Sequence, residues 1–272
     1  MDSIQSLTDL ELRGRRVLVR VDFNVPLDKA GCVTDDTRIR ASLPTLQHIL
    51  DHGGRAILMT HLGRPKGVTE DLRLKPVADR LSLLLGRQVG YVGETVGQAA
   101  GHAAEALKDG ECLLLENVRF NDGETRNDPD FARELAALGD IYVNDAFGTA
   151  HRAHASTEGV ARILPDRAAG FLMQKELDYL SGAIENPKGK LVVLLGGAKV
   201  SDKIGATRRF IEIADALIIG GGMAYPFLAS RGEPIGNSLV EKDYLDFAGE
   251  ILDRAAGLGT PILLPVDHVV AE

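Results

Sequence analysis

The stretch RVLVRVDFN, residues 16–24, decides the fold. Its centre, Val17 to Val21, is short and rich in β-branched side chains, and the polar residues Asp22 and Asn24 follow directly. Such a run is typical of a strand buried in a sheet that is covered on both faces. Ligands of open α/β sheets bind at the carboxyl ends of the strands, so the polar residues after this strand are candidates for a site.

Further apolar runs of the same kind alternate with longer amphipathic runs along the first half of the chain. The other candidate strands are Ala56 to Thr60, Val89 to Val92, Cys112 to Leu115 and Ile141 to Val143. The helices expected between them are Arg38 to His52, with Asp35, Asp36 and Thr37 as capping candidates, Lys75 to Leu85, with Pro76 near its first turn, and a run opened by Asp128-Pro129 that extends to Leu138. This alternation predicts a parallel sheet joined by helical crossovers.

A second series of elements begins after a helix predicted from Gln174 to Ile184, which ends before the turn-like Asn186-Pro187-Lys188-Gly189. We interpret that helix as a connector between two domains. Beyond it we expect strands at Leu191 to Leu195, Leu217 to Ile219 and Pro261 to Val266, and helices at about Ser201 to Ala214, Ala224 to Ala229 and Glu241 to Ala256. Three strands make a small sheet for a doubly wound domain.

Composition and charge exclude several classes of protein. The chain has 272 residues, of which 44% are hydrophobic and 26% charged, which is typical of globular proteins and excludes disordered or fibrous chains. Its net charge of -8 gives no support to nucleic-acid binding. Cys32 and Cys112 lack a paired spacing, and no apolar run is long enough for a signal peptide or a membrane helix. We therefore expect a soluble cytoplasmic protein without membrane or nucleic-acid partners.

Polar clusters follow four of the predicted strands of the first half. They are Asp22-Phe23-Asn24, His61-Leu62-Gly63-Arg64, Glu116-Asn117-Val118-Arg119 and Asn144-Asp145 with His151-Arg152-Ala153-His154. In a parallel sheet they would converge on one edge, and Arg64, Arg119 and Arg152 would form an anion pocket together with Arg38. Taken singly, an arginine in a loop is more often a solvated or locally paired side chain. Arg38, in the first turn of a helix, opposes the helix dipole and needs an anionic partner.

Two histidines raise the alternative of a metal site. His151 and His154 have a spacing that metal ligands can use, but Arg152 between them would repel a cation. We therefore predict no protein metal ligands at this position.

The second half opens with LLGGAKVSDK, residues 194–203, in which a strand leads through Gly196 and Gly197 into a helix. Glycines and a helix N-terminus favour phosphate binding, although neither a Walker A loop nor a G-x-G-x-x-G fingerprint is present. Lys199 and Lys203 are four residues apart and share a helix face if the helix has already begun at Lys199; there they could hold an anion or simply lie on the surface. Gly220, Gly221 and Gly222 after the next strand fit either a flat ring lying on the backbone or tight packing.

Six motifs together resemble the phosphoglycerate kinase family. They are RVDFNVPL at 20–27, HLGRP at 61–65, LLLENVRF at 113–120, NDAFGTAHRAHAS at 144–156, LLGGAKVSDKI at 194–204 and IIGGGMA at 218–224. The resemblance implies two doubly wound α/β domains joined by a hinge helix. It also implies reversible phosphoryl transfer in glycolysis between 1,3-bisphosphoglycerate and ADP, giving 3-phosphoglycerate and ATP. The cofactor that the resemblance implies is Mg²⁺, and the implied oligomeric state is a monomer.

The resemblance also assigns residues. The substrate-binding set that it implies is Asp22, Phe23, Asn24, Arg38, His61, Leu62, Gly63, Arg64, Arg119 and Arg152, and the nucleotide-binding set is Gly196, Gly197, Lys199, Lys203, Gly220, Gly221 and Gly222. Arg38, Lys199 and Lys203 are implied to be catalytic, because they would close on the charge of the transferring phosphoryl group.

The domains that follow from the resemblance are a phosphoglycerate-binding domain at 1–170, a linker helix at 171–188 and the first part of a nucleotide domain at 189–272. Family members are considerably longer, with a WNGP-like loop and a GGGDS-like turn that this sequence lacks. We therefore expect an incomplete second domain, with the metal held mainly by the nucleotide and by residues absent from this chain. The alternative function is a non-catalytic fragment that binds a phosphorylated acid.

Overall fold

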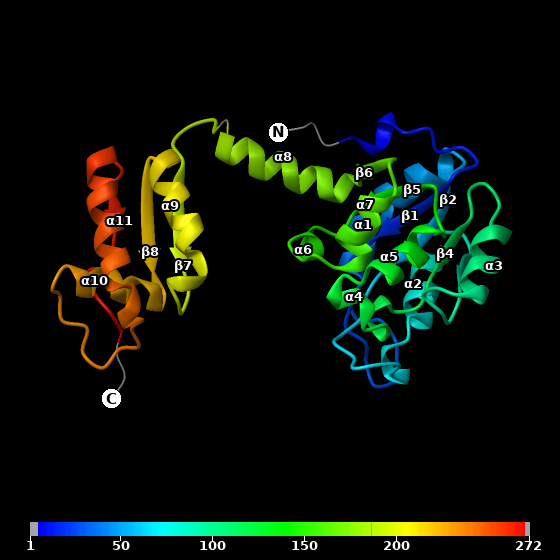
Figure 1. Ribbon diagram of the computed structural model, residues 1–272, viewed down its shortest axis with the longest axis horizontal. Helices are drawn as coiled ribbons and strands as arrows, with labels where there is room; N and C mark the ends of the chain where they lie inside the picture. Colours follow the sequence, from blue (N-terminus) through cyan, green and yellow to red (C-terminus); the bar gives the residue numbers. More distant parts are fainter. Residues whose placement is uncertain (1–4, 186, 270–272) are drawn as a thin grey trace. The chain divides into compact units, whose positions relative to one another are not determined.

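A computed structural model of the chain describes residues 5–185 and 187–269. The fold is α/β, and the chain forms two compact units, Met1–Asp178 and Tyr179–Glu272, which we call unit 1 and unit 2 (Figure 1). The domain limits predicted from the sequence stay predictions. Among the helices of the described ranges, none is both long and apolar enough to cross a membrane.

Unit 1 is built on a parallel sheet of six strands with the order β3-β4-β2-β1-β5-β6. The strands are β1 (Arg16–Arg20), β2 (Arg55–Met59), β3 (Val89–Tyr91), β4 (Cys112–Leu114), β5 (Ile141–Asn144) and β6 (Arg167–Ala169). The predicted parallel sheet is thus confirmed. The sequence missed β6, because its three residues form no apolar run.

The strand β1 lies at the middle of this sheet and is buried on both faces. Val17 and Val19 belong to one core, which α1 (Thr37–Asp51) and α2 (Lys75–Leu85) complete, whereas Leu18 belongs to a second core on the opposite face. The second core is completed by α3 (Gln98–Ala106), α5 (Pro129–Ala136) and α7 (Val160–Ile163). Alternate side chains of a strand point to opposite faces, so an apolar strand can serve both cores.

Two details of the helices differ from the sequence expectation. The helix α3 was not predicted, because its sequence QAAGHAAEA contains small residues and a glycine rather than a clear apolar stripe. Asp36 is the N-cap residue of α1 but makes no capping bond, because its carboxylate pairs with Arg40 and Arg80. The backbone N–H of Thr37 instead donates to Asp35 Oδ1 over 2.8 Å.

Unit 2 has a parallel sheet with the order β7-β8-β9. The strands are β7 (Val192–Gly196), β8 (Ala216–Gly220) and β9 (Ile262–Leu263), and the helices are α9 (Ile204–Ile213), α10 (Ala224–Ser230) and α11 (Leu245–Leu258). The helices bury one face of the sheet. Apolar side chains on the other face are exposed, and Leu194 is 73% exposed.

The remaining elements are short, apart from α8 (Phe171–Glu185), whose residues belong to both units. The short elements are α4 (Gly123–Arg126), α6 (Phe147–Ala150) and single helical turns at Leu7–Asp9, Glu70–Leu72, Val118–Phe120, Ala155–Gly159, Ser201–Lys203, Gly221–Met223 and Lys242–Tyr244. The helix expected from Glu241 to Ala256 is therefore a single turn followed by α11. Asn186, in the predicted turn after α8, lies outside the described residues.

The start of α5 provides a test of the local structure. Asp128 accepts hydrogen bonds from the backbone N–H groups of Asp130 and Phe131, both at 3.0 Å. Asp128→Ala should lower the free energy of unfolding by about 1 kcal/mol, because both donors lose their acceptor. Urea unfolding measures this loss. Asp130→Ala, at an exposed position without a capping bond, is the control, and an equal loss in both variants would contradict the capping role.

Candidate functional site

The carboxyl edge of the unit 1 sheet brings together the polar segments that follow its strands. Arg20, the last residue of β1, is in register with Met59 of β2 on one side and with Asn144 of β5 on the other. The strand β4 adjoins β2 in turn. The segments after these four strands therefore begin at the same edge of the sheet, as the sequence predicted (Figure 1).

The loop at 61–64 is held between the segments that follow β1 and β4. Asn24 Oδ1 accepts a hydrogen bond from the backbone N–H of Gly63 over 2.9 Å, and Arg119 Nη1 donates to the Gly63 carbonyl over 2.7 Å. The Asn117 side chain accepts from Leu62 N and donates to the Leu62 carbonyl. Two predicted site residues, Asn24 and Arg119, thus both contact a third, Gly63.

Arg38 finds its anionic partner within the protein. Its Nη1 lies 2.5 Å from Asp22 Oδ2, and the Arg38 side chain remains 53% exposed. Gly148 lies beside this pair, because a Cβ there would approach Asp22 Oδ2 to 3.0 Å. The carboxylate therefore holds the guanidinium near the start of α1, where the helix dipole disfavours a cation.

Three arginines line one cavity of about 420 Å³ in unit 1. These are Arg64, Arg119 and Arg152, and the other lining residues are Pro65, Asn121, Asp122, Thr125 and His154. Burial, followed by the positive charges of Arg152 and Arg20, lowers the pKa of the Arg119 guanidinium. An anion bound among these cations would relieve their repulsion, and guanidinium groups suit phosphate and carboxylate oxygens. Arg38 is not among the lining residues.

A buried polar network lies behind the cavity. Glu124, which is fully buried, accepts hydrogen bonds from Ser156 N and Ser156 Oγ, at 2.9 and 2.7 Å. Ser156 Oγ in turn accepts from Nε of the buried Arg20 over 2.8 Å. Burial raises the pKa of the Glu124 carboxyl, but the bond with His154 and the charge of Arg20 outweigh it, and the pKa is lowered. Glu124 is therefore a buried carboxylate that compensates the surrounding cations.

His61 is a neutral member of this network. Burial first, and then the charges of Arg20, Arg119 and Arg38, lower its pKa to about 2. Arg20 Nη2 lies 3.1 Å from His61 Nδ1, and guanidinium nitrogens only donate, so Nδ1 is the acceptor. The ring then carries its proton on Nε2, which leaves one donor on an uncharged side chain.

Two of the predicted substrate-binding residues have their side chains in the core. Phe23 is fully buried and Leu62 is 3% exposed, and both pack in the core formed with α1 and α2. Their backbone N–H groups are engaged by Thr60 Oγ1 and Asn117 Oδ1. Their part in substrate binding stays a prediction without a side-chain contact to support it.

The supporting residues Arg20, Glu124 and Ser156 were not singled out as site candidates from the sequence, whereas Asn117 belongs to one of the predicted polar clusters. Arg20 carried the clearest signal, because it is a charged residue at the end of an otherwise apolar strand that was expected to be buried. Glu124 lies in a polar segment, GETR, where nothing in the sequence indicates that its side chain is buried.

In unit 2, the glycines after β7 and β8 divide into two groups. Gly196 and Gly220 are paired in register, and a Cβ at Gly220 would meet nothing within 4 Å. By contrast, a Cβ at Gly221 would approach the Gly197 carbonyl oxygen to 3.0 Å, and one at Gly222 would approach the Ala198 oxygen to 2.9 Å. Close packing of the two loops therefore explains Gly221 and Gly222, whereas Gly220 borders open space.

The lysines of unit 2 lie beside the first of these glycine loops. Lys203 Nζ is 3.0 Å from where a Cβ of Gly197 would be, and Gly197 has a φ of +152° that favours glycine. Lys199 is exposed, and its charge acts on Glu241. Glu241 accepts hydrogen bonds from Val200 N over 2.6 Å and from Ser201 N over 3.0 Å. These bonds fix the loop that carries both lysines.

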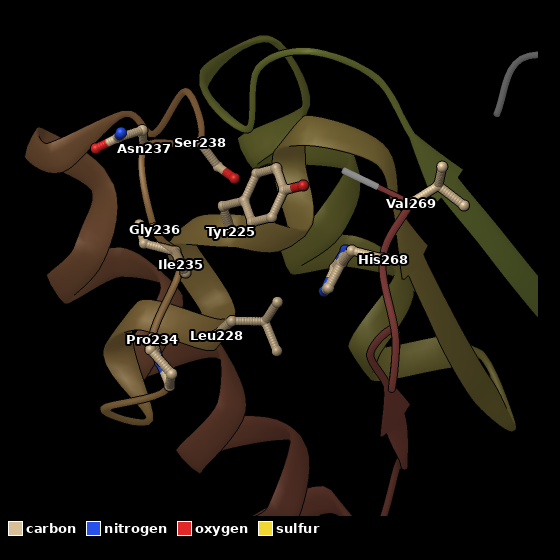
Figure 2. A pocket seen from close by; sticks show the side chains of 9 residues that line it. All are labelled: Tyr225, Leu228, Pro234, Ile235, Gly236, Asn237, Ser238, His268 and Val269. Atoms are coloured by element: carbon tan, nitrogen blue, oxygen red, sulfur yellow. The ribbon is translucent and has the colours of Figure 1, made fainter. Parts of the chain in front are cut away.

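A pocket of about 550 Å³ in unit 2 is a separate feature (Figure 2). Tyr225 and His268 face each other across it with ring centroids 5.4 Å apart, and Leu228 forms part of its wall. None of the seven predicted nucleotide-binding residues lines this pocket. This pocket therefore does not mark the predicted nucleotide site.

The described side chains do not form a cage for a divalent cation. Within residues 5–185 and 187–269, no group of three or more His, Cys, Asp or Glu side chains is arranged to hold a metal ion. The described side chains by themselves do not fit a resident metal.

Comparisons with known proteins agree on one family. The family model described as phosphoglycerate kinase matches residues 7–272. A phosphoglycerate kinase of Moorella thermoacetica is 60% identical over 268 residues, which cover 98% of this chain and 68% of the relative. A cytosolic phosphoglycerate kinase of Nicotiana tabacum is 52% identical over 270 residues, covering 99% and 67%.

The solved structures give the same result. The phosphoglycerate kinase of Coxiella burnetii superposes with a TM-score of 0.86 at 40% identity, covering 97% of this chain and 66% of that one. The chain spans about two thirds of the length of these proteins.

The buried carboxylate provides a test of the site. Glu124→Gln should lower the free energy of unfolding at pH 7.5 by about 3 kcal/mol, because it leaves the buried Arg20 without its anion. The pKa of Glu124 is lowered in the fold, so the ionised carboxylate stabilises above its unfolded pKa of about 4.3, and this contribution is lost as the pH falls through the folded pKa. Urea unfolding at pH 7.5 and in acid measures both effects.

Glu134→Gln, at an exposed position on α5, is the control for this test. It should leave stability unchanged at both pH values. A difference between wild type and Glu124→Gln that does not shrink in acid would contradict the ionised state of Glu124.

Proposed function

This chain belongs to the phosphoglycerate kinase family, glycolytic phosphotransferases that use a magnesium nucleotide, and on that premise we propose how its residues divide the reaction. The reaction is reversible transfer of a phosphoryl group between 1,3-bisphosphoglycerate and ADP, giving 3-phosphoglycerate and ATP. The observation that carries the proposal is the cavity lined by Arg64, Arg119 and Arg152 in a chain that matches the family over residues 7–272.

Unit 1 would bind the phosphorylated acid. The three arginines of the cavity suit an anion with phosphate and carboxylate oxygens, since each guanidinium presents paired N–H donors. Arg38, held by Asp22, remains half exposed and able to reach a ligand. Neutral His61, with its proton on Nε2, would donate a hydrogen bond without adding a positive charge to those of Arg38 and the three cavity arginines.

Unit 2 would bind the nucleotide. Gly220 borders open space, so a flat ring could lie on the backbone there, while Gly221 and Gly222 serve loop packing. Lys199 and Lys203 lie on the loop and turn after β7, where they suit phosphate oxygens. We assign them to the nucleotide and its transferring phosphoryl group.

Phosphoryl transfer needs positioning and charge stabilisation rather than covalent help from the protein. In the direction of ATP synthesis, the bond between the acyl oxygen and phosphorus breaks, and a terminal oxygen of ADP forms the new bond to phosphorus. The acid leaves as a carboxylate, so no proton has to move. The lysines would stabilise the charge on the equatorial oxygens. The described residues offer no cage for a metal ion, so magnesium would come with the nucleotide and would neutralise charge on its phosphates.

We further propose that the protein works as a monomer in the cytosol. The support for the location is the set of cytosolic relatives, among them the tobacco enzyme.

The first test is the initial rate of the 272-residue chain with 3-phosphoglycerate and magnesium ATP, coupled to consumption of the acyl phosphate. Turnover is expected if the chain carries the whole reaction. A folded chain that binds 3-phosphoglycerate without turnover would contradict the catalytic proposal and favour an acid-binding role.

A pair of variants tests the division between the units. Arg38→Ala should weaken 3-phosphoglycerate binding by about tenfold or more and leave ATP binding unchanged, because it removes a charged contact from unit 1 only. Lys203→Ala should do the reverse. Isothermal titration calorimetry with each ligand measures both, and Arg40→Ala and Lys190→Ala are the exposed controls. Loss of both ligands in either variant would contradict the assignment.

A further inference from the structure

Asp145 is a buried carboxylate at the site's edge of the sheet that does not line the arginine cavity. It directly follows β5 and is fully buried. Its Oδ1 accepts hydrogen bonds from the backbone N–H groups of Leu172, over 2.9 Å, and Met173, over 3.4 Å. Both donors lie in the first turn of α8, whose N–H groups have no partner within the helix. Asp145 therefore caps α8 from a different element.

The same turn of α8 is also bonded to α1. The backbone N–H of Phe171 donates to Thr45 Oγ1 over 2.9 Å, and that of Gly170 donates to the Asn144 carbonyl over 2.8 Å. A Cβ at Gly170 would lie 2.2 Å from Asp145 Oδ1, so only glycine allows this approach. The start of α8 is thus fixed to α1, which carries Arg38, and to β5, whose following segment carries Arg152.

Capping of α8 does not require a negative charge on Asp145, because a neutral oxygen would accept the same hydrogen bonds. Within the described residues Asp145 Oδ2 accepts no hydrogen bond from a backbone N–H group or a cationic side chain. Burial raises the pKa of the carboxyl to about 6, although the hydroxyls of Thr45 and Ser42 and the α8 backbone act in the opposite direction. The ionised form therefore costs stability at neutral pH, and a neutral amide would serve as an acceptor at lower cost. A carboxylate, however, holds a helix N-terminus more firmly through the helix dipole.

We propose that Asp145 is a positioning residue that fixes the direction in which α8 leaves unit 1. The boundary between the units lies within α8, after Asp178, so the residues of α8 beyond it belong to unit 2. If α8 stays a single helix across this boundary, a change at its first turn would alter the direction in which the chain enters unit 2, which carries Lys199 and Lys203. The consequence for catalysis rests on the proposed function, whereas the consequence for the geometry of the units does not.

The test compares wild type with Asp145→Asn, which keeps an acceptor oxygen and removes the charge. Spin labels are placed on Cys32, an exposed thiol, and on an introduced cysteine at the exposed position Asp253 in α11, while Cys112 is buried. Electron–electron double resonance then gives the distribution of distances between the units. Amide hydrogen exchange at Leu172 and Met173 reports on the first turn of α8. Asp109→Asn, at an exposed position of unit 1, is the matched control.

In Asp145→Asn we expect a broader or shifted distance distribution and exchange at Leu172 and Met173 that is faster by about fivefold, with a melting temperature no lower than that of wild type. The control should behave as wild type. Unchanged distances together with unchanged exchange would overturn the proposal. A fall in the melting temperature with general loss of protection would also overturn it, because Asp145 would then serve the stability of unit 1 alone.

Steady-state kinetics separate this inference from the proposed function. If wild type turns over, kcat of Asp145→Asn should fall by about fivefold while the KM for 3-phosphoglycerate stays constant, because the acid site of unit 1 is intact. A rise in KM with constant kcat would overturn the positioning role. If wild type does not turn over, the proposed function fails, and the distance and exchange measurements still decide the inference.

Discussion

Parallel hydrogen bonding of β1 between β2 and β5 is the constraint on which unit 1 depends. Parallel pairing brings all carboxyl ends to one edge, and the register of Arg20 with Met59 and Asn144 sets the segments after these strands side by side. Burial of both faces of β1 specifies that register strongly, because a slip of one residue would exchange the side chains of the two cores. The arginine cavity is a consequence of this pairing.

A site rich in arginine also needs negative charge, and in unit 1 two carboxylates supply it to the arginines. Asp22 holds Arg38 at the surface, and Glu124 compensates Arg20 in the interior. Asp145 has no cationic partner among the hydrogen bonds of its carboxyl group and bonds instead to the first turn of α8. His61 is neutral, because burial among these cations disfavours its protonation. The cavity therefore offers fixed cations whose repulsion is partly compensated before a ligand binds.

Unit 2 is also built on a parallel sheet, but different residues occupy the ends of its strands. Its two glycine loops pack against each other, and Glu241 holds the first loop through backbone N–H groups. Lysines rather than arginines lie there, and a lysine is a compact charge on a flexible stem, suited to phosphate groups that move during transfer. The helices cover one face of the sheet, and the chain spans about two thirds of the length of its relatives.

The sequence by itself determined the class of fold, the family and the order of the main strands and helices. Buried strands such as Val17 to Val21 can be recognised from their own apolar residues. Motifs such as HLGRP at 61–65 can be recognised because their residues are adjacent in the sequence. It did not reveal β6 or α3, whose short or alanine-rich sequences acquire their structure from neighbouring elements. Only the tertiary structure decided that Asp22 pairs with Arg38, that Glu124 is buried and that Asp145 caps α8. Each of these depends on groups distant in sequence being brought within hydrogen-bond distance, which local patterns of residues do not encode.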